Sequence, residues 1–122
     1  MTWPWITISG KVESSQFAMA CRASLDSAMD NQGPMNTGVY SVGGFCGRKF
    51  RLFLNNLIRA IDDPRYLEIG VFSGATLCAA IEGNTLKAVG VDDWSWGGLR
   101  KTMRSSRTST GPLRFTSREP AP

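Results

Sequence analysis

Two acidic residues, Glu68 and Asp92, are best placed to do chemistry, because Glu68 lies one residue before the end of a short apolar run and Asp92 closes a second one. Gly70 and Gly74 lie between them, at a spacing that suits a tight turn leading into a helix. A strand, a glycine turn and a helix direct backbone N–H groups and the positive end of the helix at a ligand. Because Asp92 follows the turn and ends a second apolar run, its carboxylate can accept hydrogen bonds from both ribose hydroxyls of a nucleoside.

These acids need strands to position them. Residues 66–69 and 86–91 are apolar runs of strand length, and the second run is expected to be a buried strand. Residues 75–82 between them are mostly small and apolar, which predicts a helix that packs closely on a sheet. A strand–helix–strand unit of this length requires a parallel pair of strands with a right-handed crossover. We therefore expect an α/β arrangement in which both acids lie at one edge.

Two segments together resemble the nucleotide-binding half of the class I S-adenosylmethionine-dependent methyltransferases. They are Glu68-Ile-Gly-Val-Phe-Ser-Gly74 and Val89-Gly-Val-Asp-Asp-Trp94, and residues 47–57 are similar to the lead-in helix of small bacterial and phage-type members. The resemblance covers residues 40–98 and implies a Rossmann-like three-layer methyltransferase fold with S-adenosyl-L-methionine as cofactor. We expect that fold to be incomplete, because the family has a seven-stranded sheet and this chain shows two clear strands.

The resemblance assigns cofactor binding to seven positions, which are Glu68, Gly70, Phe72, Gly74, Asp92, Asp93 and Trp94. It implies that Glu68 orders the turn near the amino-acid end of the cofactor. Asp92 is the expected ribose ligand, and Asp93 competes for that role by a one-residue slip. Trp94 is placed to stack on adenine, whereas Phe72 stands where the family commonly has a further glycine. No catalytic residue and no metal ligand is assigned, and the methyl acceptor stays open.

Each of these residues also has an ordinary structural explanation. Glu68 could be a surface acid on an edge strand, although its apolar neighbours argue against that. Asp92 could cap a helix that follows the strand. The two glycines also suit any strand-to-helix turn, and core packing explains Trp94 as well as stacking does.

Two other nucleotide-binding motifs fit the sequence less well. A phosphate-binding loop needs a lysine after its second glycine, but Ala75 and Thr76 follow Gly74. A dinucleotide fingerprint needs glycines where Phe72 and Ala75 stand when the motif is counted from Gly70. S-adenosylmethionine has no phosphate, so the absence of the motif lysine and glycines favours a sulfonium cofactor over a nucleoside phosphate.

The composition limits the remaining possibilities. The 122 residues suffice for one domain at most. The chain has no histidine, which excludes Ser-His-Asp and Cys-His catalysis within it, and its three cysteines lack the spacing of a zinc site or a disulfide framework. No apolar run has the length of a membrane span and no secretory signal is recognisable, so we expect a cytoplasmic protein without a membrane partner.

Two further helices are expected before the first strand. Residues 14–30 have an apolar face and a plausible N-cap at Ser15. Residues 48–61 form the more amphipathic helix, whose apolar stripe should cover one side of the sheet. Its other side is expected to be solvated, and it comprises Arg48, Lys49, Arg51, Asn55, Asn56 and Arg59. The glycine-rich residues 35–47 are interpreted as a connector that could border the cofactor.

The chain divides into an N-terminal arm and helix (1–34), a cofactor-binding segment (35–98) and a basic tail (99–122). The tail has six basic residues and one acid, few large apolar residues and no periodicity, so we expect it to be disordered. Its abrupt bias suggests a truncated or frame-shifted product, in which case a methyltransferase would have doubtful activity. The alternative is a non-enzymatic nucleotide-binding or interaction module, whose tail, if genuine, binds nucleic acid. The oligomeric state stays open.

Overall fold

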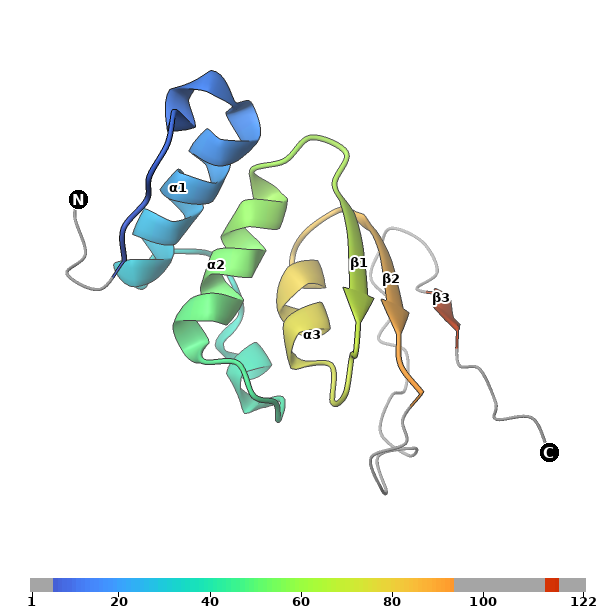
Figure 1. Cartoon of the computed structure of the whole chain (residues 1–122). Helices are drawn as coiled ribbons and strands as arrows, with labels where there is room; N and C mark the ends of the chain where they lie inside the picture. Colours follow the sequence, from blue (N-terminus) through green and yellow to red (C-terminus); the bar gives the residue numbers. More distant parts are fainter. Residues whose placement is uncertain (1–5, 94–113, 117–122) are drawn as a thin grey trace.

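The computed structural model describes residues 6–93 and 114–116, and its elements form a small α/β fold (Figure 1). In this part of the chain, three α-helices lie on one side of a parallel sheet (Figure 1). The helices are α1 (Gln16–Met29), α2 (Arg48–Arg59) and α3 (Ala75–Ile81). The strands, in spatial order, are β1 (Arg65–Ile69), β2 (Lys87–Val91) and β3 (Arg114–Thr116). Two short 3-10 helices are η1 (Val12–Ser14) and η2 (Thr37–Ser41).

The expected parallel pair is confirmed. β1 and β2 run in the same direction, with Arg65 opposite Lys87 and Ile69 opposite Val91, and α3 connects them. Pro64 disfavours helical backbone at the residue before it, so α2 ends and an extended strand begins at Arg65. The carboxyl ends of the two strands therefore meet at one edge of the sheet (Figure 1).

The tail differs from its predicted disorder at three residues. Arg114–Thr116 form β3, which pairs in parallel with β2. The sequence pattern does not predict so short a strand, because three residues are too few to show the alternation typical of strands. β2 is consequently the middle strand, and β1 lies at an edge of the sheet. The other residues of the predicted tail lie outside the described part of the chain.

Helix α1 begins and ends where the sequence indicates. The Ser15 side chain accepts a hydrogen bond from the Ala18 N–H at 3.3 Å, as an N-cap does. At the other end Asn31 adopts a left-handed φ of 57°, which stops the helix. The helix packs against α2 on the side away from the sheet (Figure 1).

The core lies between α2, α3 and one face of the sheet. Ala79 and Ala80 of α3 are fully buried, and their small side chains let this helix approach its neighbours closely, as predicted. Leu77 is 1% exposed and belongs to a cluster that Tyr66 and Ala88 of the sheet complete. The apolar stripe of α2 therefore covers one side of the sheet together with α3.

The predicted solvated side of α2 is wrong at two residues, Arg51 and Asn55. Asn55 is fully buried, and its side-chain amide donates hydrogen bonds to the carbonyls of Ala79 and Glu82, both at 2.8 Å. The Asn84 amide donates in return to the Asn55 carbonyl at 3.1 Å. These bonds join α2 to the end of α3, and they satisfy carbonyls that a helix end otherwise leaves unpaired.

The second strand is buried on one face only, which corrects the prediction of a buried strand. On the opposite face Leu67 and Ile69 are 62% and 80% exposed, and Val89 and Val91 are 41% and 39% exposed. The physical reason is that all three described helices cover the other face, so the described part of the chain has two layers rather than three.

Candidate functional site

The candidate site lies where β1 and β2 end. The Gly70 N–H donates to the Val91 carbonyl at 2.8 Å, which continues the pairing one residue beyond the strand. Gly70 has φ 84° and Gly74 has φ 86°, backbone conformations that glycine adopts without the steric cost of a side chain. The turn between them therefore stays beside the end of β2.

Asp92 contacts this turn directly. Its Oδ2 accepts a hydrogen bond from the Phe72 N–H at 2.5 Å. Phe72 has φ 50°, an uncommon conformation for a residue with a side chain, and the bond to a charged acceptor helps to hold it there. The structure thus brings the second strand's acid and the glycine turn together, as the sequence predicted.

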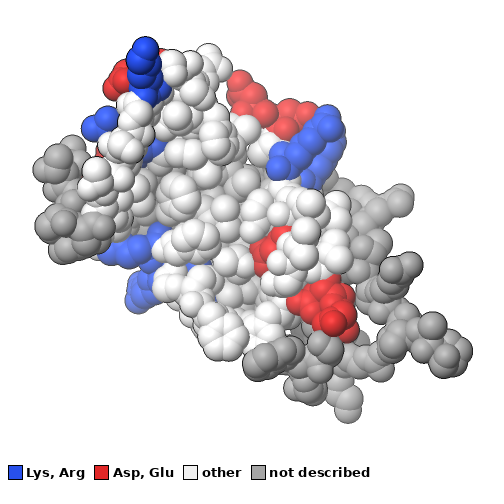
Figure 2. All heavy atoms as spheres, viewed as in Figure 1, with Lys and Arg blue, Asp and Glu red and all other residues white. Residues whose placement is uncertain are grey.

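The structure gives less information about the roles of Asp93 and Trp94 than about that of Asp92. The bond to Phe72 selects Asp92 as an acid that faces the turn, and Asp93 follows as an exposed residue. Trp94 lies outside the described residues, so its expected stacking role stays a prediction. Figure 2 shows acidic atoms over the end of β2 and a mixed group of basic and acidic atoms at the other end of the sheet.

Glu68 is buried although β1 is an edge strand. Its side chain faces α3, where its two oxygens accept hydrogen bonds from the Tyr66 hydroxyl and the Thr76 hydroxyl, both at 2.6 Å. These bonds compensate the carboxylate for lost water. They also connect the strand before the turn to the helix after it, so Glu68 fixes both ends of the turn. The burial of Glu68 excludes the alternative explanation that it is a surface acid.

The same contact changes the acidity of Tyr66. Burial raises the pKa of its phenol above the ordinary value because it disfavours the charged phenolate, and the Glu68 carboxylate raises the pKa further because it accepts the phenol's hydrogen bond and repels a second negative charge. Tyr66 therefore remains a hydrogen-bond donor at neutral pH. Burial likewise raises the pKa of the Cys78 thiol, with Glu68 and Glu82 adding to the effect, so Cys78 is not an activated nucleophile.

The glycine-rich connector borders the turn. The Ser73 hydroxyl donates to the Gly43 carbonyl, and the ring of Phe45 stacks on that of Phe72 with centroids 5.3 Å apart. A Cβ on Gly44 would lie 2.6 Å from the Cβ of Ala75, so this approach requires glycine. A ligand above the turn would therefore meet Phe45, whose side chain is almost fully exposed.

Arg51 fixes this connector, a role that the sequence did not reveal. Its guanidinium is buried and donates to the carbonyls of Val39 and Val42 at 2.9 and 2.7 Å, and to that of Cys46 at 3.3 Å. These acceptors are backbone atoms, so residue types alone carry no signal for them. The one signal in the sequence for this role of Arg51 is that a glycine-rich loop, whose carbonyls need donors, precedes a helix that contains arginine.

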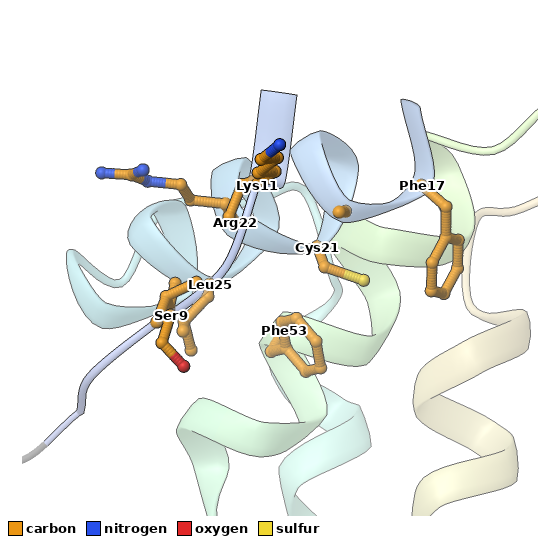
Figure 3. A pocket seen from close by; sticks show the side chains of 10 residues that line it. Ser9, Lys11, Phe17, Cys21, Arg22, Leu25 and Phe53 are labelled. Carbon is orange, nitrogen blue, oxygen red and sulfur yellow. The ribbon is translucent and has the colours of Figure 1, made fainter. Parts of the chain in front are cut away.

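A separate cavity of about 380 Å³ lies away from the turn, between the N-terminal segment, α1 and α2 (Figure 3). Figure 3 shows Cys21 and Leu25 of α1 beside the ring of Phe53, with the Arg22 side chain extending away from that ring. The lining residues are Ile8, Ser9, Lys11, Val12, Phe17, Ala18, Cys21, Arg22, Leu25 and Phe53. This mainly apolar lining contains no carboxylate that could bind a ribose.

Comparisons with protein-family models, with curated proteins and with solved structures find no match for this chain. None of the helices in residues 6–93 has the length and apolar composition needed to cross a membrane. Across the same described residues and 114–116, no group of three or more His, Cys, Asp and Glu side chains could hold a metal ion. The geometry of the site is therefore the basis of the function proposed below.

Proposed function

We propose that the chain binds S-adenosyl-L-methionine at the edge formed by Glu68, the turn from Gly70 to Gly74, and Asp92. In this proposal it is the cofactor-binding part of a class I methyltransferase with a Rossmann-like fold. The observation that carries the proposal is the 2.5 Å hydrogen bond between Asp92 Oδ2 and the Phe72 N–H. This bond supports the proposal because it brings the expected ribose-binding acid and the expected methionine-binding turn to the same place.

The residues have different tasks in this proposal. Asp92 accepts hydrogen bonds from the ribose hydroxyls beside the one from the Phe72 N–H, since a carboxylate can serve several donors at once. Gly70 and Gly74 let the backbone approach the methionine part closely. Glu68 acts as a positioning residue, because its bonds to Tyr66 and Thr76 fix both sides of the turn.

The bound cofactor would supply an electrophilic methyl group for transfer to an acceptor. The turn and Asp92 would orient that group, and Phe45 beside Phe72 would limit its contact with water. The acceptor and any base that activates it are left open in this proposal, as in the sequence analysis.

Isothermal titration calorimetry of the whole chain with S-adenosylmethionine and S-adenosylhomocysteine tests the proposal. Asp92→Asn keeps an oxygen for the Phe72 N–H but removes the charge, so we expect affinity to fall about tenfold or more. Asp30→Asn, at the exposed end of α1, is the matched control and should bind like the parent.

A folded parent that gives no heat with either ligand would contradict the proposal. That result would favour the alternative, a non-enzymatic nucleotide-binding or interaction module. An Asp92→Asn variant that binds as tightly as the parent would exclude the ribose contact specifically.

A further inference from the structure

The cavity between the N-terminal segment, α1 and α2 shares no residue with the proposed cofactor site. Its volume of about 380 Å³ is large enough for a small organic molecule. Apolar side chains line it from all three elements, with Ile8 from the segment, Leu25 from α1 and Phe53 from α2. Figure 3 shows Cys21 and Leu25 beside the Phe53 ring. The hydrocarbon part of a ligand would therefore lose contact with water on several sides here.

Both charged residues of the lining, Lys11 and Arg22, are basic. Figure 3 shows their charged ends directed away from the ring of Phe53, so they border the cavity and leave its floor apolar. In the described part of the chain both ion pairs involve Asp63, so neither cation of the lining has a carboxylate within ion-pair distance. Glu13, two residues after Lys11, does not line the cavity. The rim therefore carries two positive charges above an apolar floor.

We propose that this cavity binds a single-chain amphipathic anion, namely a fatty-acid monomer. Its alkyl chain lies along the apolar lining, and its carboxylate faces Lys11 and Arg22. The long stems of these two side chains can cover the alkyl chain while their charged ends stay at the carboxylate. A ligand that is polar throughout fits poorly, because Ser9 carries the one hydroxyl of the lining and enclosed polar groups need hydrogen-bond partners. The proposal goes beyond cofactor binding and does not depend on it.

Isothermal titration calorimetry of the whole chain with octanoate, decanoate and dodecanoate, each below its micelle concentration, tests the role of the apolar lining. Affinity should rise about two- to fourfold for each added methylene group, because each one leaves water on binding. Decyltrimethylammonium has a similar chain and the opposite charge, so it should bind at least fivefold more weakly than decanoate. A folded parent that binds no carboxylate, an affinity independent of chain length, or equal affinity for both head groups would overturn the proposal.

Neutralisation of the rim tests where the carboxylate lies. Lys11→Gln and Arg22→Gln should each weaken dodecanoate binding about two- to fivefold, since a solvent-exposed ion pair contributes modestly. Lys87→Gln is the matched control, because it removes one exposed positive charge from the sheet and should bind like the parent. Equal affinities of all three variants would exclude the assigned position of the carboxylate.

A larger side chain inside the cavity tests where the alkyl chain lies. Ala18→Phe places a ring in the lining and should weaken dodecanoate binding at least tenfold. Ala23→Phe, at an exposed position of the same helix outside the lining, is the matched control and should bind like the parent. Circular dichroism shows whether each variant keeps its helices, and the comparison of head groups in the parent needs no variant. A folded Ala18→Phe variant that binds like the parent would overturn the proposal.

Discussion

The two faces of the sheet differ in both packing and chemistry. The face toward the helices carries Tyr66 and Glu68, whose polar atoms are hydrogen-bonded beneath a close-packed layer of α3. The opposite face carries aliphatic side chains that are exposed in the described structure. The difference shows that the covered face alone stabilises the described fold and positions the candidate site, whereas the other face has the composition of a core without its partner. Three stability measurements test this division, two of them with a variant matched for position.

Truncation of a residue in the covered layer should have the largest effect. Leu77→Ala removes a side chain that is 1% exposed and leaves a cavity, so we expect the free energy of unfolding to fall by about 2–5 kcal/mol. The matched change on the open face, Ile69→Ala, should cost less than about 0.5 kcal/mol. Urea unfolding at low micromolar concentration measures both, and equal losses would mean that the open face is packed as tightly as the covered one.

Loss of the amide between α2 and α3 should have an intermediate effect. Asn55→Ala leaves the buried carbonyl of Ala79 and the half-buried carbonyl of Glu82 without these donors, so we expect a loss of about 1–3 kcal/mol. The next residue supplies the control, because the Asn56 amide donates to the exposed Gln32 carbonyl, where water can replace it. Asn56→Ala should therefore lose less than about 0.5 kcal/mol in the same assay, and similar losses would contradict the role of Asn55.

Tyr66 should give the smallest effect, confined to alkaline solution. Its pKa is higher in the folded chain than the ordinary value of about 10, so the folded state holds the proton more tightly. Stability from this group is present below pH about 10 and declines as pH rises further. Tyr66→Phe should reduce that decline. Cys78, whose pKa is also raised, contributes in the same direction to both proteins and leaves the difference to Tyr66. An unchanged alkaline decline would contradict this linkage.

The sequence predicted the parts of the fold that depend on local pattern. The stripe of α2, the Ser15 cap and the two strands around a glycine turn follow from spacing and residue type, and the structure confirms them. The position of Glu68 was also foreseeable, because an acid between apolar neighbours requires hydrogen-bond donors. Its donors, Tyr66 and Thr76, lie two and eight residues away along the chain.

The features that the sequence missed depend on distant backbone atoms. Asn55 was assigned to the solvated side of α2, but its acceptors lie 24 and 27 residues away. Arg51 was also misassigned, since the carbonyls it binds belong to η2 and the residue after it, a short 3-10 helix that the glycine-rich sequence did not predict. The open face was missed because an apolar strand pattern indicates burial without saying what covers each side. The methyltransferase resemblance stays a prediction, as does the role of Trp94.

The bond from Asp92 to Phe72 has a consequence for the order in which the chain assembles. The turn after β1 is held by a residue that is synthesised twenty positions later. The nascent turn consequently lacks this restraint until β2 has docked, so the conformation of the turn should be among the last parts of the fold to mature. By the same logic, transient detachment of β2 would release the turn while the helices stay packed, so the candidate site would open locally without global unfolding.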